Sequence, residues 1–488
     1  MKKKSILALA VLALAGAAQA APEFTGSIVV PGASGDQFGK SINDGRLGMF
    51  SDLYYDRQRN EWWALSDRGP GGGTISYETR AQRFTIDVNP ATGAISNFQV
   101  QQTVKFTANG AALNGLAPAN AGVLGNAFDP EGVVVNPRNG NLLVSDEYGT
   151  SVYEFNRSGQ RLRALNMPQN LVPKVNGTAD YNAAPPPGAG ALTSGREGNR
   201  GLEGLAISPD GQYAYAMLQN GTVGDSTAAG RSMYARIVKF DMDNGNAVAQ
   251  YAYRLDGAGP APAQGRGISA LVALDDHRFM VLERNNRGVG VPNANLASPD
   301  KKVYVIDIAG ATDVSSIDLN TTALPSGAVA VGKSTSALLD LAAQAPAAFG
   351  GRSPEKWEGL TVGPQLADGS FLLLAGTDND YSVTQNATGS QLEVYFNPSL
   401  IGTANVSRIQ CPLGQTTDCQ YVRDNGDLGA SIASLPSGYA LIPGLLNGYK
   451  VSAAELGGYT APVPEPGTYA MLLAGLGVAG LAARRRKS

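Results

Sequence analysis

The chain has 488 residues, of which 43% are hydrophobic and 16% are charged, and its formal net charge is −3. This balance excludes a mostly disordered chain and predicts a sizeable buried core, while the lack of a basic excess argues against nucleic acid as a partner. Glycine is abundant, with 61 residues, but follows no Gly-X-Y period. That excludes collagen and suits many short strands joined by tight turns.

The N-terminal end has the three parts of a secretory signal peptide. Three lysines follow Met1, residues 6–15 are apolar, and Ala18-Gln19-Ala20 provides a cleavage site with small residues at its first and third positions. We therefore expect signal peptidase to remove residues 1–20 and the remaining chain to be exported. An uncleaved N-terminal membrane helix is the alternative, although the apolar stretch is short for a membrane span.

Self-similar segments dominate the middle of the chain. Each of the three clearest begins with Glu-Gly, continues as a short apolar strand and ends at a Pro or Gly turn; they are Glu131–Pro137, Glu203–Pro209 and Glu358–Pro364. A second strand follows each turn and ends in a polar cluster. Two weaker copies begin at Ser51 and Ser269. Period-two apolar patterning with Asn-Gly, Asp-Gly and Ser-Gly turns is typical of β-hairpins.

The spacing of these copies predicts the fold. They begin at 51, 131, 203, 269 and 358, and most are followed by another alternating strand. Four strands with variable insertions per unit fit the blade of a β-propeller. We therefore expect an all-β chain with a β-propeller over residues 21–450. Five blades are visible directly, and a sixth is expected if the strand at 27–30 pairs with late sequence. A β-sandwich or two stacked β-domains is the alternative.

These motifs resemble the phytase-like propeller family, whose members are called "esterase-like activity of phytase" proteins. The resemblance covers about residues 45–398 and rests on the Glu-Gly-Leu strand starts and on three other motifs: Asp67-Arg68-Gly69, Phe128-Asp129-Pro130-Glu131-Gly132 and Asp378-Asn379-Asp380. It implies a propeller and, by the family's name, hydrolysis of a phosphate or other ester. Because one fold hosts many functions, the activity must be argued from the site.

Acidic residues recur at matching positions of the repeat. Since hairpin strands run antiparallel, the start of a first strand and the end of a second lie at the same edge, so both sets of carboxylates should approach one face. The residues predicted to act in catalysis are Asp67, Arg68, Glu131, Glu203 and Glu358. The carboxylates predicted to hold a metal ion are Asp146, Glu147, Glu283, Asp378 and Asp380.

Converging carboxylates repel one another unless a cation lies between them, and oxygen ligands without His or Cys favour Ca²⁺. Arg68, Arg284 and Arg287 are candidates to hold phosphate oxygens beside it. The sequence therefore predicts a Ca²⁺-assisted phosphoester hydrolase, in which the metal polarises the phosphoryl group and lowers the pKa of an attacking water. In one alternative, each Glu-Gly carboxylate accepts backbone N–H bonds from the neighbouring blade. In another, the propeller binds an extracellular polysaccharide or a surface partner without catalysis.

Cysteine and histidine exclude several other chemistries. Cys411 and Cys419 are the only cysteines, and in an exported chain we expect them to form one disulfide. Two cysteines and one histidine exclude a zinc cluster and a haem-attachment motif. The single histidine, His277, stands in a polar turn, and no Gly-x-Ser-x-Gly motif occurs, which argues against a Ser–His–Asp esterase.

The C-terminal end also has three parts. Pro464-Glu465-Pro466 precedes an apolar segment at 469–483, and four basic residues follow at 484–487. The apolar segment rises about 22 Å as a helix, which is short of a roughly 30 Å hydrocarbon core, but flanking arginines can snorkel. This arrangement resembles the PEP-CTERM sorting signal of Gram-negative bacteria, here over residues 464–488 after a linker at 451–463.

The resemblance to this signal implies transient anchoring in the inner membrane, processing by an exosortase near Pro464–Pro466, and delivery to the cell surface or extracellular matrix. A plain C-terminal anchor is the alternative. Without residues 1–20 and 464–488 the chain loses seven basic residues and one acidic residue, which leaves 31 basic and 40 acidic residues and a net charge of −9. The exported body is therefore expected to be acidic.

Overall fold

A computed structural model describes residues 21–462 except for 43, 183–189, 228–229, 257–265, 292–295, 297, 320–321, 387, 404–405 and 424. The predicted signal peptide, the Pro464-Glu465-Pro466 motif and the apolar segment at 469–483 lie outside the described residues. The regular structure of the described part is strand apart from four short 3₁₀ turns, at Leu341–Ala343, Ala347–Phe349, Asp380–Ser382 and Pro398–Leu400, so the all-β prediction is confirmed. Within this part of the chain, no helix is long and apolar enough to cross a membrane.

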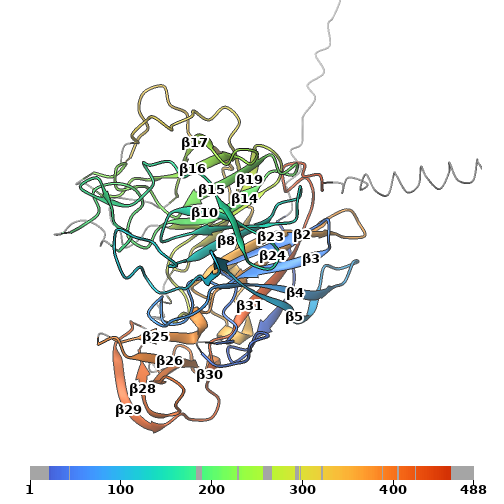
Figure 1. Cartoon of the computed structure of the whole chain (residues 1–488). Coiled ribbons are helices and arrows are strands. Elements are labelled where there is room, and N and C mark those ends of the chain that lie inside the picture. Colours follow the sequence, from blue (N-terminus) through green and yellow to red (C-terminus); the bar gives the residue numbers. More distant parts are fainter. Residues whose placement is uncertain are drawn as a thin grey trace, which may run out of the picture.

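Five antiparallel sheets form the body of the molecule (Figure 1). The first contains β2 (Asp52–Asp56), β3 (Glu61–Leu65), β4 (Arg80–Val88) and β5 (Ile95–Lys105). The second contains β8 (Pro130–Val135), β9 (Leu142–Asp146), β10 (Ser151–Phe155) and β11 (Arg161–Ala164). The third contains β14 (Leu202–Ile207), β15 (Tyr213–Leu218), β16 (Tyr234–Asp241) and β17 (Ala247–Arg254).

The fourth sheet contains β18 (Gly267–Ala273), β19 (Arg278–Arg284), β20 (Lys301–Asp307), β21 (Gly332–Lys333) and β22 (Leu339–Asp340). The fifth contains β23 (Trp357–Gln365), β24 (Phe371–Thr377), β31 (Gly444–Val451) and β1 (Glu23–Val30). Two short hairpins lie in loops: β6 (Thr107–Ala108) with β7 (Ala111–Ala112), and β12 (Lys174–Val175) with β13 (Thr178–Ala179).

The first strand of each sheet lies on a central axis. β2 packs against β8, β8 against β14, β14 against β18, β18 against β23, and β23 against β2, so the five strands close a ring. Inner strands that pack side by side, each carrying the rest of its sheet outward, are the defining arrangement of a β-propeller. The predicted propeller is confirmed.

The predicted pairing of the N-terminal strand with late sequence is present, but it does not produce a sixth blade. β1 pairs with β31, with Val30 opposite Gly444, and β31 pairs with β24. The N-terminal strand therefore becomes the outermost strand of the fifth sheet, and the two ends of the propeller close one blade together. The prediction of six blades is not confirmed, since the ring formed by the described residues has five sheets.

The glycine of each Glu-Gly start is required by the contact between neighbouring inner strands. A Cβ on Gly132 would lie 2.6 Å from the Cβ of Leu205 on β14, and a Cβ on Gly359 would lie 2.7 Å from the Cγ of Leu53 on β2. Gly204 approaches β18 in the same way. Only glycine lets the next strand come this close. The repeat thus marks the contact from one blade to the next.

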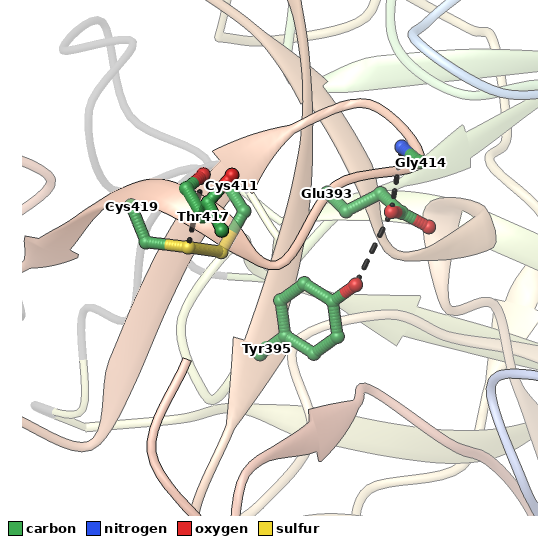
Figure 2. The surroundings of a disulfide bond; sticks show 6 residues. All are labelled: Glu393, Tyr395, Cys411, Gly414, Thr417 and Cys419. Atoms are coloured by element: carbon green, nitrogen blue, oxygen red, sulfur yellow. Dashed lines mark hydrogen bonds between the residues drawn. A yellow bond between two sulfur atoms is a disulfide. The ribbon is translucent and has the colours of Figure 1, made fainter. Parts of the chain in front are cut away.

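A sixth sheet lies outside the ring and appears as a separate lobe at the bottom of Figure 1. It contains β25 (Val383–Gln385), β26 (Gln391–Phe396), β27 (Arg408–Pro412), β28 (Thr417–Val422), β29 (Leu428–Ser434) and β30 (Ala440–Leu441). The predicted pairing of Cys411 with Cys419 is present as a disulfide between β27 and β28 (Figure 2). Glu393 accepts a hydrogen bond from the Gly414 N–H and forms a buried ion pair with Arg46, with 2.6 Å between Oε1 and Nη2.

The segment predicted as a linker, residues 451–463, packs against the fifth sheet in its described part. Leu456 is fully buried, and the ring of Tyr459 lies 4.9 Å from that of Phe371. The packed domain therefore extends through Tyr459, beyond the boundary at 450, because these apolar side chains cover the end of β24.

Candidate functional site

Each Glu-Gly start contains a β-bulge at its glutamate. The pairing of β8 with β9 skips from Pro130 to Val133, and the pairings of β14 with β15 and of β23 with β24 skip Glu203 and Glu358. A bulge removes a residue from the regular ladder and redirects its side chain. Glu131 and its two counterparts therefore stand at equivalent points of three inner strands, as the repeat predicts.

Eight carboxylates and three cations gather where the inner strands begin, and we call this the carboxylate end of the propeller. The carboxylates are Asp67, Asp129, Glu131, Glu147, Glu203, Glu358, Asp378 and Asp380, and the cations are Arg68, Arg284 and Lys356. Each cation already contacts a carboxylate. Arg196, Arg200 and Lys301 lie beside the group and offset part of its charge. The remaining excess of negative charge is self-repelling and favours an additional cation.

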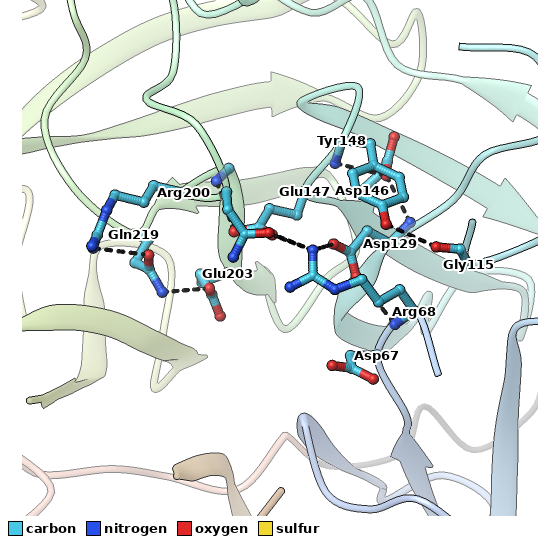
Figure 3. A network of polar contacts seen from close by, with 12 residues as sticks. Asp67, Arg68, Gly115, Asp129, Asp146, Glu147, Tyr148, Arg200, Glu203 and Gln219 are labelled. Carbon is cyan, nitrogen blue, oxygen red and sulfur yellow. Dashed lines mark hydrogen bonds and ion pairs between the residues drawn. The ribbon is translucent and has the colours of Figure 1, made fainter. Parts of the chain in front are cut away.

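Arg68 connects two of these carboxylates (Figure 3). Its Nη1 lies 2.8 Å from Oδ2 of Asp129 and 3.5 Å from Oε2 of Glu147, and its backbone N–H donates to Oδ1 of Asp129 at 3.1 Å. The other oxygen of Glu147, Oε1, accepts the Gly201 N–H at 3.2 Å. Burial raises the pKa of Asp129 well above its usual range, and the nearby guanidinium only partly opposes this.

Lys356 connects a second set. It directly precedes β23, while Asp378 directly follows the paired strand β24, so both lie at the same edge of one hairpin. Its Nζ lies 2.7 Å from Oδ2 of Asp378 and 2.6 Å from Oδ1 of Asp380. Asp380 begins three residues with φ of 45°, 55° and 58°, a left-handed conformation that is costly outside glycine and is found at functional sites. Burial raises the pKa of Asp67, the third acid of this set, to about 6 against the effect of Lys356.

The three Glu-Gly carboxylates differ in their partners. Glu358 pairs with Nη2 of Arg284, and Oε1 of Glu203 accepts a hydrogen bond of 2.6 Å from the Gln219 amide. Glu131 has no hydrogen bond or ion pair with any residue that the structure describes, although it is only 7% exposed. Burial, followed by repulsion from Glu203, raises the pKa of Glu131 well above its usual range.

The alternative role for these glutamates, as acceptors of backbone N–H groups from the next blade, is not seen among the described residues. Asp52 has that role instead. Its Oδ2 accepts the N–H of Val133 on the adjacent inner strand at 2.8 Å, and Oδ1 accepts that of Leu53 at 2.8 Å. The Glu-Gly carboxylates are therefore not used to join the blades.

Two of the predicted metal ligands lie apart from the group. The oxygens of Asp146 accept the backbone N–H groups of Tyr148 and Gly149 in its own turn, at 3.1 and 2.9 Å, and that of Asp129 directly before β8, at 3.0 Å. Glu283 turns away from the axis and forms ion pairs of 2.5 Å with Lys333 and 3.1 Å with Arg266. Arg287 lies in the loop that follows β19. Asp146 and Glu283 are therefore not part of the site, because their oxygens already have partners elsewhere. Arg287 is not part of it either, since it lies in a loop beyond the strand.

Two members of the group were not assigned from the sequence. Asp129 stands two residues before Glu131 inside the motif Phe128–Gly132, and Lys356 stands two residues before Glu358. Both flank a Glu-Gly start, which is the signal that points to them. The contact of Asp129 with Arg68 joins two blades, and that of Lys356 with Asp378 joins the two strands of one hairpin; the Glu-Gly spacing identifies neither pair.

The opposite end of the ring has a cavity of about 820 Å³. The far ends of all five inner strands line it, together with Arg57, Tyr459 and Pro462. The described chain therefore ends beside this cavity, at the side of the propeller away from the carboxylate end.

The carboxylate end makes the stability of the metal-free protein dependent on pH. Burial raises the pKa of Asp67 in this group to about 6, from an ordinary value near 4. It raises to about 7 the pKa values of two buried acids that neighbour the group, Asp146 at the end of β9 and Glu355 directly before Lys356. Between about pH 4 and 7 the folded chain thus holds more protons than the unfolded chain, so stability falls as pH rises through this window. In thermal melts with a chelator, we expect a lower Tm at about pH 8 than at about pH 5. A Tm that is constant or rises over this range would contradict the assignment.

Residues 45–381 match the family described as "Phytase-like: Esterase-like activity of phytase". This span is more than half of the chain. The chain belongs to the phytase-like family. The fold that the family resemblance implies agrees with the ring of sheets described above.

Other proteins similar to this phytase-like chain are more distant. An uncharacterized secreted protein of Arthroderma benhamiae is 29% identical over 225 residues, which are 37% of this chain and 44% of the relative. The chain thus spans less than half the length of that relative. Among solved structures, the periplasmic gluconolactonase of Pseudomonas aeruginosa is 13% identical with a TM-score of 0.27, over 86% of this chain and 99% of that chain. The glutaminyl cyclase of Myxococcus xanthus is 12% identical with a TM-score of 0.32, over 74% and 92%. Similarity this weak supports no further argument.

The C-terminal end of this phytase-like protein, residues 462–487, matches the PEP-CTERM protein-sorting motif. The motif indicates a secreted protein that crosses the membrane and is sorted to the surface of a Gram-negative bacterium. It also implies that an exosortase processes the protein during export. The family and the motif together establish an exported propeller protein.

Processing predicts a change of mass. Protein released from the cell surface is expected to lack residues 469–488 in intact-mass measurements, because exosortase cleaves near the Pro464-Glu465-Pro466 motif. A variant with alanine at these three positions should retain the tail. Retention of the tail by the unaltered protein would show that the segment is a permanent anchor.

Proposed function

We propose that this exported propeller is a Ca²⁺-assisted phosphoester hydrolase whose site is the carboxylate end. The observation that carries the proposal is Glu131, a buried carboxylate without a partner among the described residues, in a group of eight carboxylates and three cations. An additional cation would relieve this repulsion, and a hard cation suits a set of donors that consists only of oxygen.

The residues present fit such an ion. Asp129, Glu131 and Glu147 each offer an oxygen within 4.8 Å of the others, and Oε2 of Glu147 is buried without a hydrogen bond. These three carboxylates would hold Ca²⁺. When bound, the ion would act as a Lewis acid toward a phosphoryl oxygen and would lower the pKa of a water.

The chain's own residues supply the remaining functions. Burial and the neighbouring Glu147 raise the pKa of Glu203, and a carboxylate that is more basic than usual is suited to take up a proton from an attacking water. Arg284 holds Glu358 through Nη2 and donates from Nε to Ser269, while its Nη1 donates no hydrogen bond to a described residue. That nitrogen is suited to a phosphate oxygen, whose charge it would stabilise.

A second function, binding without catalysis, is favoured by a different observation. Arg68, Arg284 and Lys356 each pair with a carboxylate of the group, so a phosphate must compete with these contacts. In this alternative the carboxylate end binds a cation that bridges to an extracellular polysaccharide or a surface partner, and no bond is broken.

The experiment that separates the two functions is an ester-hydrolysis assay with and without Ca²⁺. We expect the purified protein to hydrolyse a phosphate monoester only when Ca²⁺ is present. With Ca²⁺ at saturating concentration, we expect the Glu203→Gln variant to lose about 10²- to 10⁴-fold in kcat, because a general base is removed. Glu78→Gln, which removes an exposed carboxylate elsewhere, is the matched control. Binding of Ca²⁺ without turnover of phosphate or carboxylate esters would favour the binding function.

A further inference from the structure

We infer that Lys356 occupies one of two carboxylate triads in the place of a metal ion, so that the protein binds one divalent cation, at the other triad. The inference rests on the proposed function, because it concerns the same end of the propeller. It goes further by fixing how many ions bind and which side chain excludes a second one.

The two triads are alike in composition. The first consists of Asp67, Asp378 and Asp380 and the second of Asp129, Glu131 and Glu147, and within each triad the oxygens lie within 4.8 Å of one another. Each triad also has one basic side chain against it, Lys356 in the first and Arg68 in the second. Net charge alone therefore does not decide which triad takes a metal ion. The position of the basic group does.

In the first triad the ammonium group lies where an ion would lie. Nζ of Lys356 is within hydrogen-bond distance of two carboxylates, at 2.7 Å from Asp378 and 2.6 Å from Asp380. The backbone fixes this position, since the Asp378 N–H donates to the carbonyl oxygen of Lys356 at 3.0 Å. Asp67 accepts the N–H of Gly69 at 3.0 Å, so every carboxylate of the triad has a donor. A compact ammonium is the basic group that most resembles a small cation.

In the second triad the cation position is left open. The planar guanidinium of Arg68 lies against Asp129 and only approaches Glu147, at 3.5 Å. Oε2 of Glu147 is buried without a hydrogen bond, and Glu131 has no partner among the described residues. These two carboxylates therefore lack a cation to neutralise them. Each triad thus has three acids and one base, but the cation position is filled by Lys356 in the first triad and is open in the second.

The experiment is a calcium-binding stoichiometry, measured by titration calorimetry and by equilibrium dialysis on the exported protein. We expect one Ca²⁺ per chain for the unaltered protein and none for Glu131→Gln. Lys356→Met removes the ammonium while keeping a side chain of similar length, and we expect it to bind two Ca²⁺ per chain. The double variant Glu131→Gln with Lys356→Met should bind one, at the first triad.

Lys356→Arg is the conservative control and should still bind one ion, because it keeps a positive charge between the two aspartates; it also serves if Lys356→Met does not fold. Two ions bound by the unaltered protein or by Lys356→Arg, one ion bound by a folded Lys356→Met, or none bound by any variant would each overturn the inference. The proposed activity is tested separately. If the stoichiometries are as predicted but no ester is hydrolysed, the hydrolase is refuted and this inference stands. If the unaltered protein hydrolyses esters but binds two ions, the hydrolase stands and this inference is refuted.

Discussion

Replacing Glu131 by glutamine is expected to stabilise the metal-free protein and to abolish its response to Ca²⁺. Burial raises the pKa of Glu131, and the charges of Glu203, Asp129 and Glu147 raise it further. Removing its charge relieves the repulsion, so at about pH 8 the Tm of the variant in chelator should exceed that of the unaltered protein. At a Ca²⁺ concentration 100 times Kd, the unaltered protein should gain about 2.7 kcal/mol of stability and the variant none.

The test is specific because the variant should be more stable than the unaltered protein in chelator and yet should gain no stability from Ca²⁺. A residue that merely supports the fold would lower stability in both conditions when replaced. Glu78→Gln removes the same charge from an exposed position, and we expect it to keep the full Ca²⁺ response. If Glu131→Gln melts at a lower temperature than the unaltered protein in chelator and still responds to Ca²⁺, the carboxylate does not hold the ion.

Replacing Arg284 by methionine is expected to destabilise the protein by about 3–5 kcal/mol, which is the range for breaking a buried ion pair. The side chains of Arg284 and Glu358 are only 11% and 4% exposed, and they contact one another directly. Without the guanidinium, Glu358 remains buried near Glu203, and its remaining cation is the ammonium of Lys356 at 4.0 Å, which already contacts Asp378 and Asp380. Urea unfolding of the metal-free protein measures the loss.

The double variant Arg284→Met with Glu358→Gln separates the pair from the packing of the arginine stem. We expect it to recover much of the lost stability, because neither charge is then left alone. A loss below about 1 kcal/mol for Arg284→Met would mean that the pair behaves like an exposed one. That outcome would also weaken the argument that this end of the propeller is poorly solvated.

The propeller could be predicted from the sequence because each Glu-Gly repeat is required by the contact between neighbouring inner strands. In each Glu-Gly start the glycine admits the neighbouring inner strand, as Gly132 admits Leu205, and the glutamate occupies a bulge. The number of blades was predicted less well. The pairing of β1 with late sequence was correct, but only the three-dimensional order of strands shows that it completes the fifth sheet.

The convergence of Glu131, Glu203 and Glu358 followed from antiparallel pairing, which fixes the edge at which a strand begins. The side of the strand on which a side chain lies was harder to predict. Asp146 and Glu283 end second strands at the correct edge, yet one closes its own turn and the other faces Lys333 away from the axis. A shift of one residue along a strand moves a side chain to the other face of the sheet, and the spacing of the repeats alone does not determine which face it occupies.

Which side chains pair with one another at this edge could not be predicted. Lys356 lies beside Glu358 in the sequence, but its contacts are with Asp378 and Asp380 from the end of another strand. Such pairs depend on which loops meet at the axis. They nevertheless decide which carboxylates are neutralised and which remain open, and so they decide where a cation is expected.

The central claim is that the carboxylate end binds a calcium ion, and a Ca²⁺ titration of thermal stability at about pH 8 tests it most directly. The account predicts that the Tm of the exported protein rises with Ca²⁺ concentration until the site is saturated, and that the rise is smaller at about pH 5, where protons compete for the same carboxylates. A Tm that is the same with saturating Ca²⁺ and with chelator would contradict it.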